Sequence, residues 1–196
     1  MGVRSETWYT ADLHIGHRLM AEKRGFVDPG EHDAELARRW DAVVSESDVV
    51  WVLGDVSAGG RRSQRRAVAW IAERPGVKHL IAGNHDAVHP MHPDAHRIAR
   101  DYLEAFASVQ QTASRTLDGN RVLLSHFPYI DSDDPDDTHN RFDQWRLPFR
   151  GSWLLHGHTH SARKVGNYAI HVGLDAWNLD PVSINSVVEL IRAQNT

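Results

Sequence analysis

The chain has 196 residues, a net charge of -4 at neutral pH and no cysteine, so its length fits one domain (1–196) and neither disulfides nor thiolate metal sites can form. The acidic charge argues against tight binding to long nucleic acid, although two bound cations would still make a pocket attractive to a small anion. The sequence has no run of about eighteen apolar residues and no apolar leader, so we expect neither a membrane span nor secretion, and the cysteine-free composition is consistent with a cytoplasmic protein.

Strand and helix patterns alternate in the first half of the chain. Short apolar runs predict strands, and apolar residues three or four positions apart predict helices. We expect strands at 7–10, 48–53 and 77–82. We expect an irregular stretch up to Gly30, and then helices at about 33–45, 61–74 and 90–106.

The second half reads mostly as strand. A hairpin is predicted at 109–117 and 121–125, around the turn residues 118–120, and the acidic stretch 131–137 is predicted to be a loop. Further strands are expected at 153–156, 168–172 and 184–191. An alternating half followed by a strand-rich half predicts two packed sheets with helices outside them.

Ligand-type side chains follow most of the predicted strands. They lie in five segments: Asp12-Leu13-His14, Gly54-Asp55, Gly83-Asn84-His85-Asp86, Ser125-His126 and Gly157-His158-Thr159-His160. The carboxyl ends of strands form the binding crevice in α/β folds, so we expect these segments to meet. Within two of them the donor residues are two positions apart, which would point both side chains the same way in an extended chain. Oxygen and imidazole donors without sulfur favour Mn, Fe, Zn or Ni over Ca.

Each segment taken alone also has an ordinary structural explanation. Asp12 or Asp55 could be a buried hydrogen-bonding carboxylate, His126 could be a satisfied interior histidine, and Asn84 could be a turn residue. Only the joint arrangement favours a metal centre.

The order D-x-H, G-D, G-N-H-D, H and G-H-T-H, spread over residues 12 to 160, resembles the calcineurin-like metallophosphoesterases. The resemblance implies an α/β fold, a four-layer sandwich of two β-sheets flanked by helices. It implies two divalent metal ions, manganese in the first place, with iron, zinc or nickel as alternatives. It also assigns the ligands: Asp12, His14 and His160 for the first metal, Asn84, His126 and His158 for the second, and Asp55 as the bridge.

The implied reaction is hydrolysis of a phosphate ester by a hydroxide that bridges the two metals. Two divalent cations about 3.5–4 Å apart can clamp a phosphate and deprotonate a shared water. His85, beside Asn84, is the expected general acid for the leaving group. Protein Ser/Thr phosphatases of this superfamily carry a second Asp three residues after the bridging one, where this chain has Ala58. A protein phosphatase is therefore not expected, and the group that orients His85 stays open.

The substrate is predicted only by class. The segments 12–17, 125–129 and 173–177 look like those of small bacterial and phage-borne phosphoesterases, some of which act on 2′,3′-cyclic nucleotides. The leading hypothesis is a phosphodiesterase for a small nucleotide-type substrate. The alternatives are a nuclease or a phosphomonoesterase with the same two metals, and a non-catalytic metal-binding protein. The sequence does not predict the oligomeric state.

Several other polar residues are candidate neighbours of the site. His17 and Arg141 are candidate phosphate contacts, with Asn140 beside them, and Trp145 could stack on a base, although solvated loop residues and a core tryptophan are the alternative. His171 and Asp175 are candidate partners of metal-bound histidines. The remaining groups are expected to be solvated helix surface: His89, His92 and His96, and the basic residues Arg61, Arg62, Arg65 and Arg66.

Overall fold

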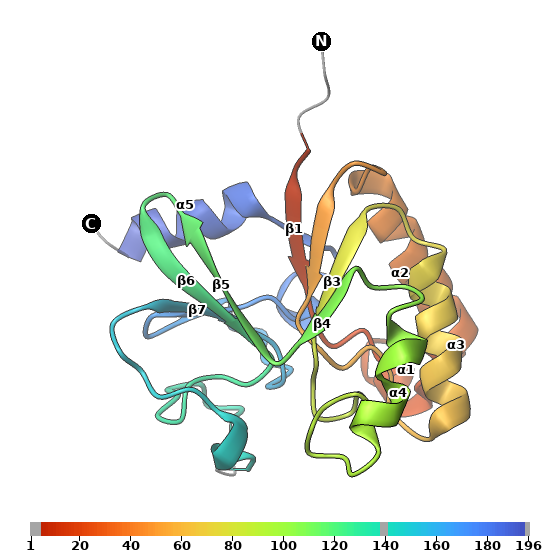
Figure 1. Cartoon of the computed structure of the whole chain (residues 1–196). Coiled ribbons are helices and arrows are strands. Elements are labelled where there is room, and N and C mark those ends of the chain that lie inside the picture. The colour runs from red at the N-terminus through yellow and green to blue at the C-terminus, as the bar shows by residue number, and fades with distance from the viewer. Residues whose placement is uncertain (1–4, 138–140, 195–196) are drawn as a thin grey trace.

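The computed structural model describes residues 5–137 and 141–194, which form two β-sheets and the helices around them (Figure 1). The first sheet has the strand order β10-β1-β2-β3-β4. Its strands β1 to β4 are parallel, and β10 pairs with β1 in the antiparallel sense. Their bounds are β1 Thr7–Thr10, β2 Val49–Val52, β3 Val77–Ile81, β4 Ser108–Gln110 and β10 Val182–Ser183.

The second sheet has the order β5-β6-β7-β9-β8 and mixes both senses of pairing. The pairs β5–β6 and β8–β9 are antiparallel, whereas β6, β7 and β9 run parallel. The bounds are β5 Thr112–Leu117, β6 Asn120–Ser125, β7 Trp153–His156, β8 Val165–Gly166 and β9 Ala169–His171. The carboxyl ends of β1, β2, β3, β6 and β7 therefore carry the five ligand-bearing segments.

Alternation along the strands separates two apolar clusters. Val50, Val52 and Leu80 face outward from the first sheet and pack with residues of the helices that cover it, including Trp40 and Ile71. The helices are α1 Arg18–Lys23, α2 Pro29–Val43, α3 Arg61–Ala72, α4 Ala95–Tyr102 and α5 Ile184–Gln194, with short 3-10 turns at Asp143–Trp145 and Leu174–Ala176.

The second cluster lies between the sheets. It joins Tyr9, Trp51 and Leu53 of the first sheet region to Leu124 and Ile170 of the second, and buried side chains of α5 complete it. The predicted α/β architecture of two β-sheets flanked by helices is thus confirmed. None of the described helices combines the length and the apolar character that a membrane crossing needs.

The prediction of a strand at 184–191 was wrong, because this segment is the helix α5. Val187 and Ile191, four positions apart, are the residues that α5 buries. The Oγ of Ser183 accepts the Ser186 backbone N–H at 3.1 Å, as a helix-capping residue does. Periodicity in a short apolar run does not separate a strand from a buried helix, and the capping serine is the signal that favours the helix.

Three other boundaries differ from the sequence prediction. The expected strand 109–117 is two strands in different sheets, since the chain crosses between sheets at Gln111. The stretch before Gly30 contains α1, and α2 begins early because Asp28 Oδ1 accepts the Gly30 N–H at 2.7 Å, with Pro29 at the first helical position. Only the second half of the predicted helix 90–106 is regular, as α4.

Asp48, at the amino end of β2, should contribute strongly to stability. Its carboxylate is buried and accepts the N–H groups of Glu6 at 2.8 Å and Ser45 at 2.9 Å, and the indole N–H of Trp8 at 3.2 Å. Asp48→Ala leaves three donors without this partner, and we expect a loss of about 2–4 kcal/mol in the free energy of unfolding. Denaturant titration of the metal-free protein measures this loss.

The same contacts predict an acid dependence. Burial alone would raise the pKa of Asp48, but hydrogen bonds from Ser45 and Glu6 lower it below its usual value. A lowered folded pKa means that the stabilisation is full above the unfolded pKa of about 3.9 and is lost as pH falls through the folded value. Glu46→Ala, an exposed acid on the same turn, is the matched control. Equal denaturant midpoints for Asp48→Ala and Glu46→Ala would contradict the stabilising role of Asp48.

Candidate metal centre

The five ligand-bearing segments converge where the carboxyl ends of the two sheets meet. Asp12 and His14 follow β1, Asp55 follows β2 and Asn84 follows β3, while the remaining three donors follow strands of the second sheet. The structure brings together all seven residues proposed as ligands: Asp12, His14, Asp55, Asn84, His126, His158 and His160.

Five of these residues have a left-handed backbone. The φ values are 61° for Asp12, 49° for His14, 55° for Asp55, 75° for His158 and 54° for His160. The spacing of the two pairs predicted an extended chain, and this prediction was wrong, because both residues of each pair have a left-handed backbone. Such conformations are strained in residues other than glycine and are common at functional sites. They indicate that the surrounding structure holds these side chains in place at a cost in stability.

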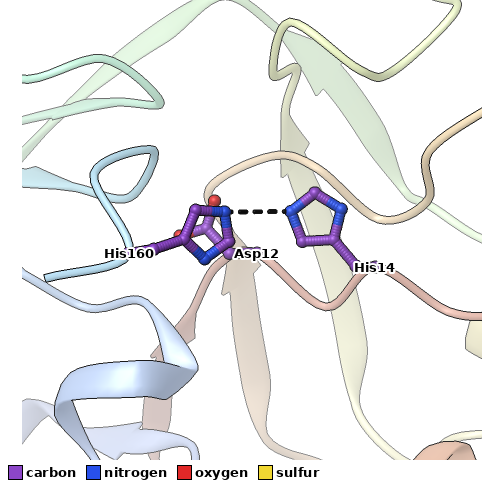
Figure 2. Close-up of side chains that lie close together, drawn as sticks. All are labelled: Asp12, His14 and His160. Atoms are coloured by element: carbon purple, nitrogen blue, oxygen red, sulfur yellow. Dashed lines mark hydrogen bonds between the residues drawn. The ribbon is translucent and has the colours of Figure 1, made fainter. Parts of the chain in front are cut away.

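One group of donors lies between β1 and the turn after β7. His14 Nε2 and His160 Nε2 face each other at 3.2 Å, with the Asp12 carboxylate close by (Figure 2). Asp12 is fully buried, and both of its oxygens lie 3.1 Å from the backbone N–H of His158. One ion could therefore contact all three side chains.

A second group lies between β3 and the second sheet. His126 Nε2 is 3.0 Å from Asn84 Oδ1 and 3.2 Å from His158 Nδ1. Asp55 stands between the two groups, because its Oδ2 is 3.8 Å from His14 Nε2 and 3.5 Å from His126 Nε2. Its other oxygen accepts the backbone N–H of His85 at 2.9 Å. One carboxylate thus reaches both groups.

The hydrogen bonds leave the right nitrogens free for metal binding. His126 Nδ1 donates to the Leu53 carbonyl at 2.8 Å, and His160 Nδ1 donates to Asp175 Oδ2 at 2.8 Å. Both residues therefore present the Nε2 lone pair to the site. Two donors that are each about 2.1 Å from one ion lie roughly 3.0–3.4 Å apart. The distance of 3.2 Å in the first group and those of 3.0 and 3.2 Å in the second match this range.

The buried charges also fit bound cations. Burial and the neighbouring Asp12 carboxylate raise the pKa of Asp55 well above its usual range. Burial alone would raise the pKa of Asp12 too, but His171, His160 and His126 lower it well below its usual range. Burial lowers the pKa of His14 and takes that of His158 to about 2, so these imidazoles are neutral ligands at neutral pH. Two adjacent buried carboxylates beside these neutral imidazoles call for positive charge.

A partly buried ion pair supports the first donor group on the side of His160. Arg24 Nε and one terminal nitrogen bind the two oxygens of Asp175 at 2.9 Å, and the same terminal nitrogen donates to the Asp12 carbonyl at 2.8 Å. The pKa of Asp175 is held well below its usual range mainly by Arg24 and then by His160, against the effect of burial. Asp175 was predicted as a partner of a ligand, and Arg24 was missed because a lone arginine after a short helix carries no sequence signal.

Asp86, the last residue of the G-N-H-D segment, joins two of the loops. Its carboxylate accepts the backbone N–H groups of Gly83 at 2.8 Å and of Asp55 and Val56 at 2.9 Å each. Burial and the Asp55 charge raise its pKa to about 7. Asp86 thereby fixes the loop after β2 against the loop after β3. Asp86 was not predicted to have a role, although its place in the G-N-H-D segment was a signal.

His85 and His17 lie on the His14 side of the site. Their ring centroids are 5.5 and 5.7 Å from that of His14. The His85 side chain is exposed, and its backbone carbonyl accepts Gln64 Nε2 at 2.9 Å. No hydrogen bond to the His85 imidazole occurs within the described part of the chain, so no described carboxylate orients this ring. The buried Nδ1 of His17 has no partner among the described residues.

The other candidates have mixed outcomes. Arg141 is exposed, with its guanidinium over the Phe142 ring at 5.0 Å from the centroid, whereas Asn140 lies outside the described residues. Trp145 packs edge-on against His89 at 5.0 Å between centroids. His171 is buried, with Nε2 3.8 Å from Asp12 Oδ2, and it helps to lower the pKa of this carboxylate.

The expected helix-surface position is correct for only one of three histidines. His89 is buried in the loop before α4, and His92, in the same loop, donates its Nε2 hydrogen to the Asn84 carbonyl at 2.9 Å. Only His96 lies on α4 and is exposed. Two prolines in 90–93 delay the start of the helix and free this loop to reach back to the site. The basic residues of α3 are exposed, as expected: Arg61, Arg62, Arg65 and Arg66.

Comparison with known proteins agrees with this geometry. A sequence model described as "Calcineurin-like phosphoesterase" matches residues 6–162. The Gene 66 protein of Mycobacterium phage L5 is 48% identical, with 96% of this chain and 95% of the phage protein covered. The Gene 66 protein of Mycobacterium phage D29 is 47% identical, with 96% of each chain covered. A crystal structure of an Aquifex aeolicus protein of unknown function shares the fold, with a TM-score of 0.70 and 19% identity over 95% of this chain and all of that one, 100%.

Proposed function

Because this chain belongs to the calcineurin-like phosphoesterase family, a family of metal-dependent phosphoester hydrolases, we propose that it is a phosphodiesterase for a small nucleotide-type substrate, with 2′,3′-cyclic nucleotides as the first candidates. The observation that carries the proposal is the pair of donor groups that share Asp55. The acidic net charge favours a small substrate over long nucleic acid. We keep the cytoplasm as the proposed compartment because the chain contains no cysteine.

We assign a role to each donor. Asp12, His14 and His160 would hold one divalent cation, and the second group would hold the other: Asn84, His126 and His158. Asp55, which reaches both groups, would serve both ions. Mixed carboxylate, amide and imidazole donors suit manganese, with iron, zinc or nickel as alternatives. When bound, the two cations polarise the phosphate and activate a water for attack.

The remaining steps belong to the chain's own side chains. Asp55 keeps the two donor groups in register, since its backbone is fixed by Asp86 and its free oxygen holds the His85 N–H. His85 donates a proton to the alkoxide that leaves, while His17 and Arg141 bind phosphate oxygens and the Asn84 amide contacts one of them. Exposure of the His85 side chain allows it to reach a leaving group at the mouth of the site.

The test is a substrate panel with metal-loaded protein. Protein reconstituted with Mn, Fe, Zn or Ni should hydrolyse bis-p-nitrophenyl phosphate and 2′,3′-cyclic nucleotides faster than p-nitrophenyl phosphate. Cleavage of single- or double-stranded nucleic acid in preference to these would favour the nuclease alternative, and preference for the monoester would favour a phosphomonoesterase. Absence of turnover on every ester with every metal would refute the proposal and leave a non-catalytic metal-binding protein.

The Asp175–His160 contact predicts a specific effect on metal affinity. Asp175→Asn removes the charge that accepts the Nδ1 hydrogen of His160, and partners of this kind are worth about 10–100-fold in metal affinity. We expect the affinity for the ion of the first donor group to fall by this factor, measured by calorimetric titration of metal into metal-free protein. Asp180→Ala, which removes the exposed acid paired with Arg39, is the control. Unchanged affinity in Asp175→Asn would contradict the assignment.

A further inference from the structure

Aromatic side chains form a wall beside the second donor group. The buried Phe127 ring lies 5.0 Å from those of His126 and His158. Phe142 is the outermost ring of this wall, 5.4 Å from Phe127 and 5.6 Å from His158 between centroids, and it is only half-buried. A partly exposed aromatic ring therefore stands directly beside a residue that we assign as a metal ligand.

The backbone holds Phe142 in an unfavourable conformation. Its φ is 67°, a left-handed value that a bulky residue rarely adopts. Two contacts keep it there. The Trp145 N–H donates to the Phe142 carbonyl at 2.8 Å, and the buried Arg146 ties the segment to the Pro128 carbonyl at 3.2 Å and to Asp137. Strain of this kind persists only where the surroundings enforce it, and it is typical of functional positions.

The cation above this ring has no acidic partner among the residues that the structure describes. The Arg141 guanidinium lies over Phe142 at 5.0 Å from the ring centroid and makes no ion pair within the described part of the chain. It is therefore free to attract an anionic group toward the aromatic ring. Trp145 is the other aromatic candidate on this segment, but its ring already packs edge-on with His89.

The two sides of the site differ in chemistry. His85 and His17 lie near His14, on the side of the first donor group, whereas Phe142 and Arg141 lie by His158, on the side of the second. An acyclic diester held between the groups with its leaving oxygen at His85 would extend its other substituent toward Phe142. That substituent stays on the phosphate after hydrolysis.

We propose that Phe142, assisted by Arg141, is a specificity-determining residue that stacks on an aromatic retained group, a nucleobase or an aryl ring. This inference rests on the proposed phosphodiesterase function and adds the substrate class that the site prefers. Stacking of an aromatic side chain on a base is worth about 1–3 kcal/mol, or roughly 5–150-fold in affinity.

The test compares two diesters with the same leaving group. Phenyl p-nitrophenyl phosphate and methyl p-nitrophenyl phosphate release the same p-nitrophenolate, so the ratio of their kcat/KM values reports recognition of the retained group alone. We expect Phe142→Ala to lower the phenyl-to-methyl ratio by about tenfold. Phe142→Leu, which keeps packing against Phe127, should lower the phenyl-to-methyl ratio similarly. Phe142→Trp, which keeps an aromatic ring, should retain the wild-type ratio. In Phe142→Ala and Phe142→Leu the inhibition constant of phenyl phosphate should rise relative to that of methyl phosphate by about the same factor.

Phe149→Ala is the matched control, because this exposed ring contacts Tyr129 and Tyr168 away from the donor groups. It should keep the wild-type ratio. If the wild-type enzyme is active and both Phe142→Ala and Phe142→Leu keep the wild-type phenyl-to-methyl ratio, this inference is overturned and the proposed function stands. A metal-loaded wild-type protein that hydrolyses neither these diesters nor any ester of the substrate panel would overturn the proposed function itself.

Discussion

Asp55→Ala is expected to lower kcat/KM on any phosphodiester by at least about 10³-fold and to remove metal from both donor groups together. The reason is position: one oxygen of Asp55 lies 3.8 Å from His14 Nε2 and 3.5 Å from His126 Nε2, so a single carboxylate serves both groups. Charge stabilisation by bound metal is worth several kcal/mol in the transition state, and about 4 kcal/mol corresponds to a thousandfold. Steady-state kinetics and elemental analysis of the purified variant measure both effects.

Asp48→Ala is the matched control for this prediction. Asp48 and Asp55 are buried carboxylates at opposite ends of β2, and only Asp55 lies at the donor groups. The folded Asp48 variant should keep its metal content while losing stability. Asp55→Asn, which keeps the shape of the side chain, should lose activity as the alanine variant does. Two metal ions retained by Asp55→Ala would show that Asp55 does not bridge.

His85→Gln is expected to lower kcat by about 10²–10⁴-fold on a diester with an alkoxide leaving group, and far less on a p-nitrophenyl ester. An alkoxide needs a proton as it leaves, whereas p-nitrophenolate leaves without one. The His85 side chain is exposed beside His14 and has no hydrogen-bond partner for its imidazole among the described residues, so it is free to face a substrate. Kinetics on matched alkyl and aryl diesters give the two losses.

The pH profile should separate an acid from a binding residue. Desolvation, followed by the charge of His126, lowers the pKa of His85 below its ordinary value, and bound cations would lower it further. The wild-type rate on an alkyl diester should therefore fall as pH rises through a value below about 6.5, because the protonated imidazole is lost. His85→Gln should lack this limb, and His96→Gln, an exposed histidine of α4, should keep it. Equal losses on both esters would rule out acid catalysis by His85.

Local pattern was enough for the fold class but not for every element. The strands β1, β2 and β3 and the helix α3 lie close to the predicted ranges, because each combines a clear periodicity with turn or breaker residues at its end. α5 was mistaken for a strand because a short apolar run with adjacent valines fits either element until tertiary packing chooses. The break between β4 and β5 was not visible, since it depends on which sheet each half joins.

For the site, the sequence by itself determined the donor types, their order and their places after strands, because ligand chemistry needs particular atoms and the strand pattern places them at one edge. Only the tertiary structure decided how those atoms meet. The left-handed backbone at Asp12 and Asp55, the Arg24–Asp175 pair behind His160 and the Phe142 ring beside His158 all depend on contacts between segments far apart in the chain. No local pattern encodes such contacts, since their free energy arises only when the two sheets have packed together.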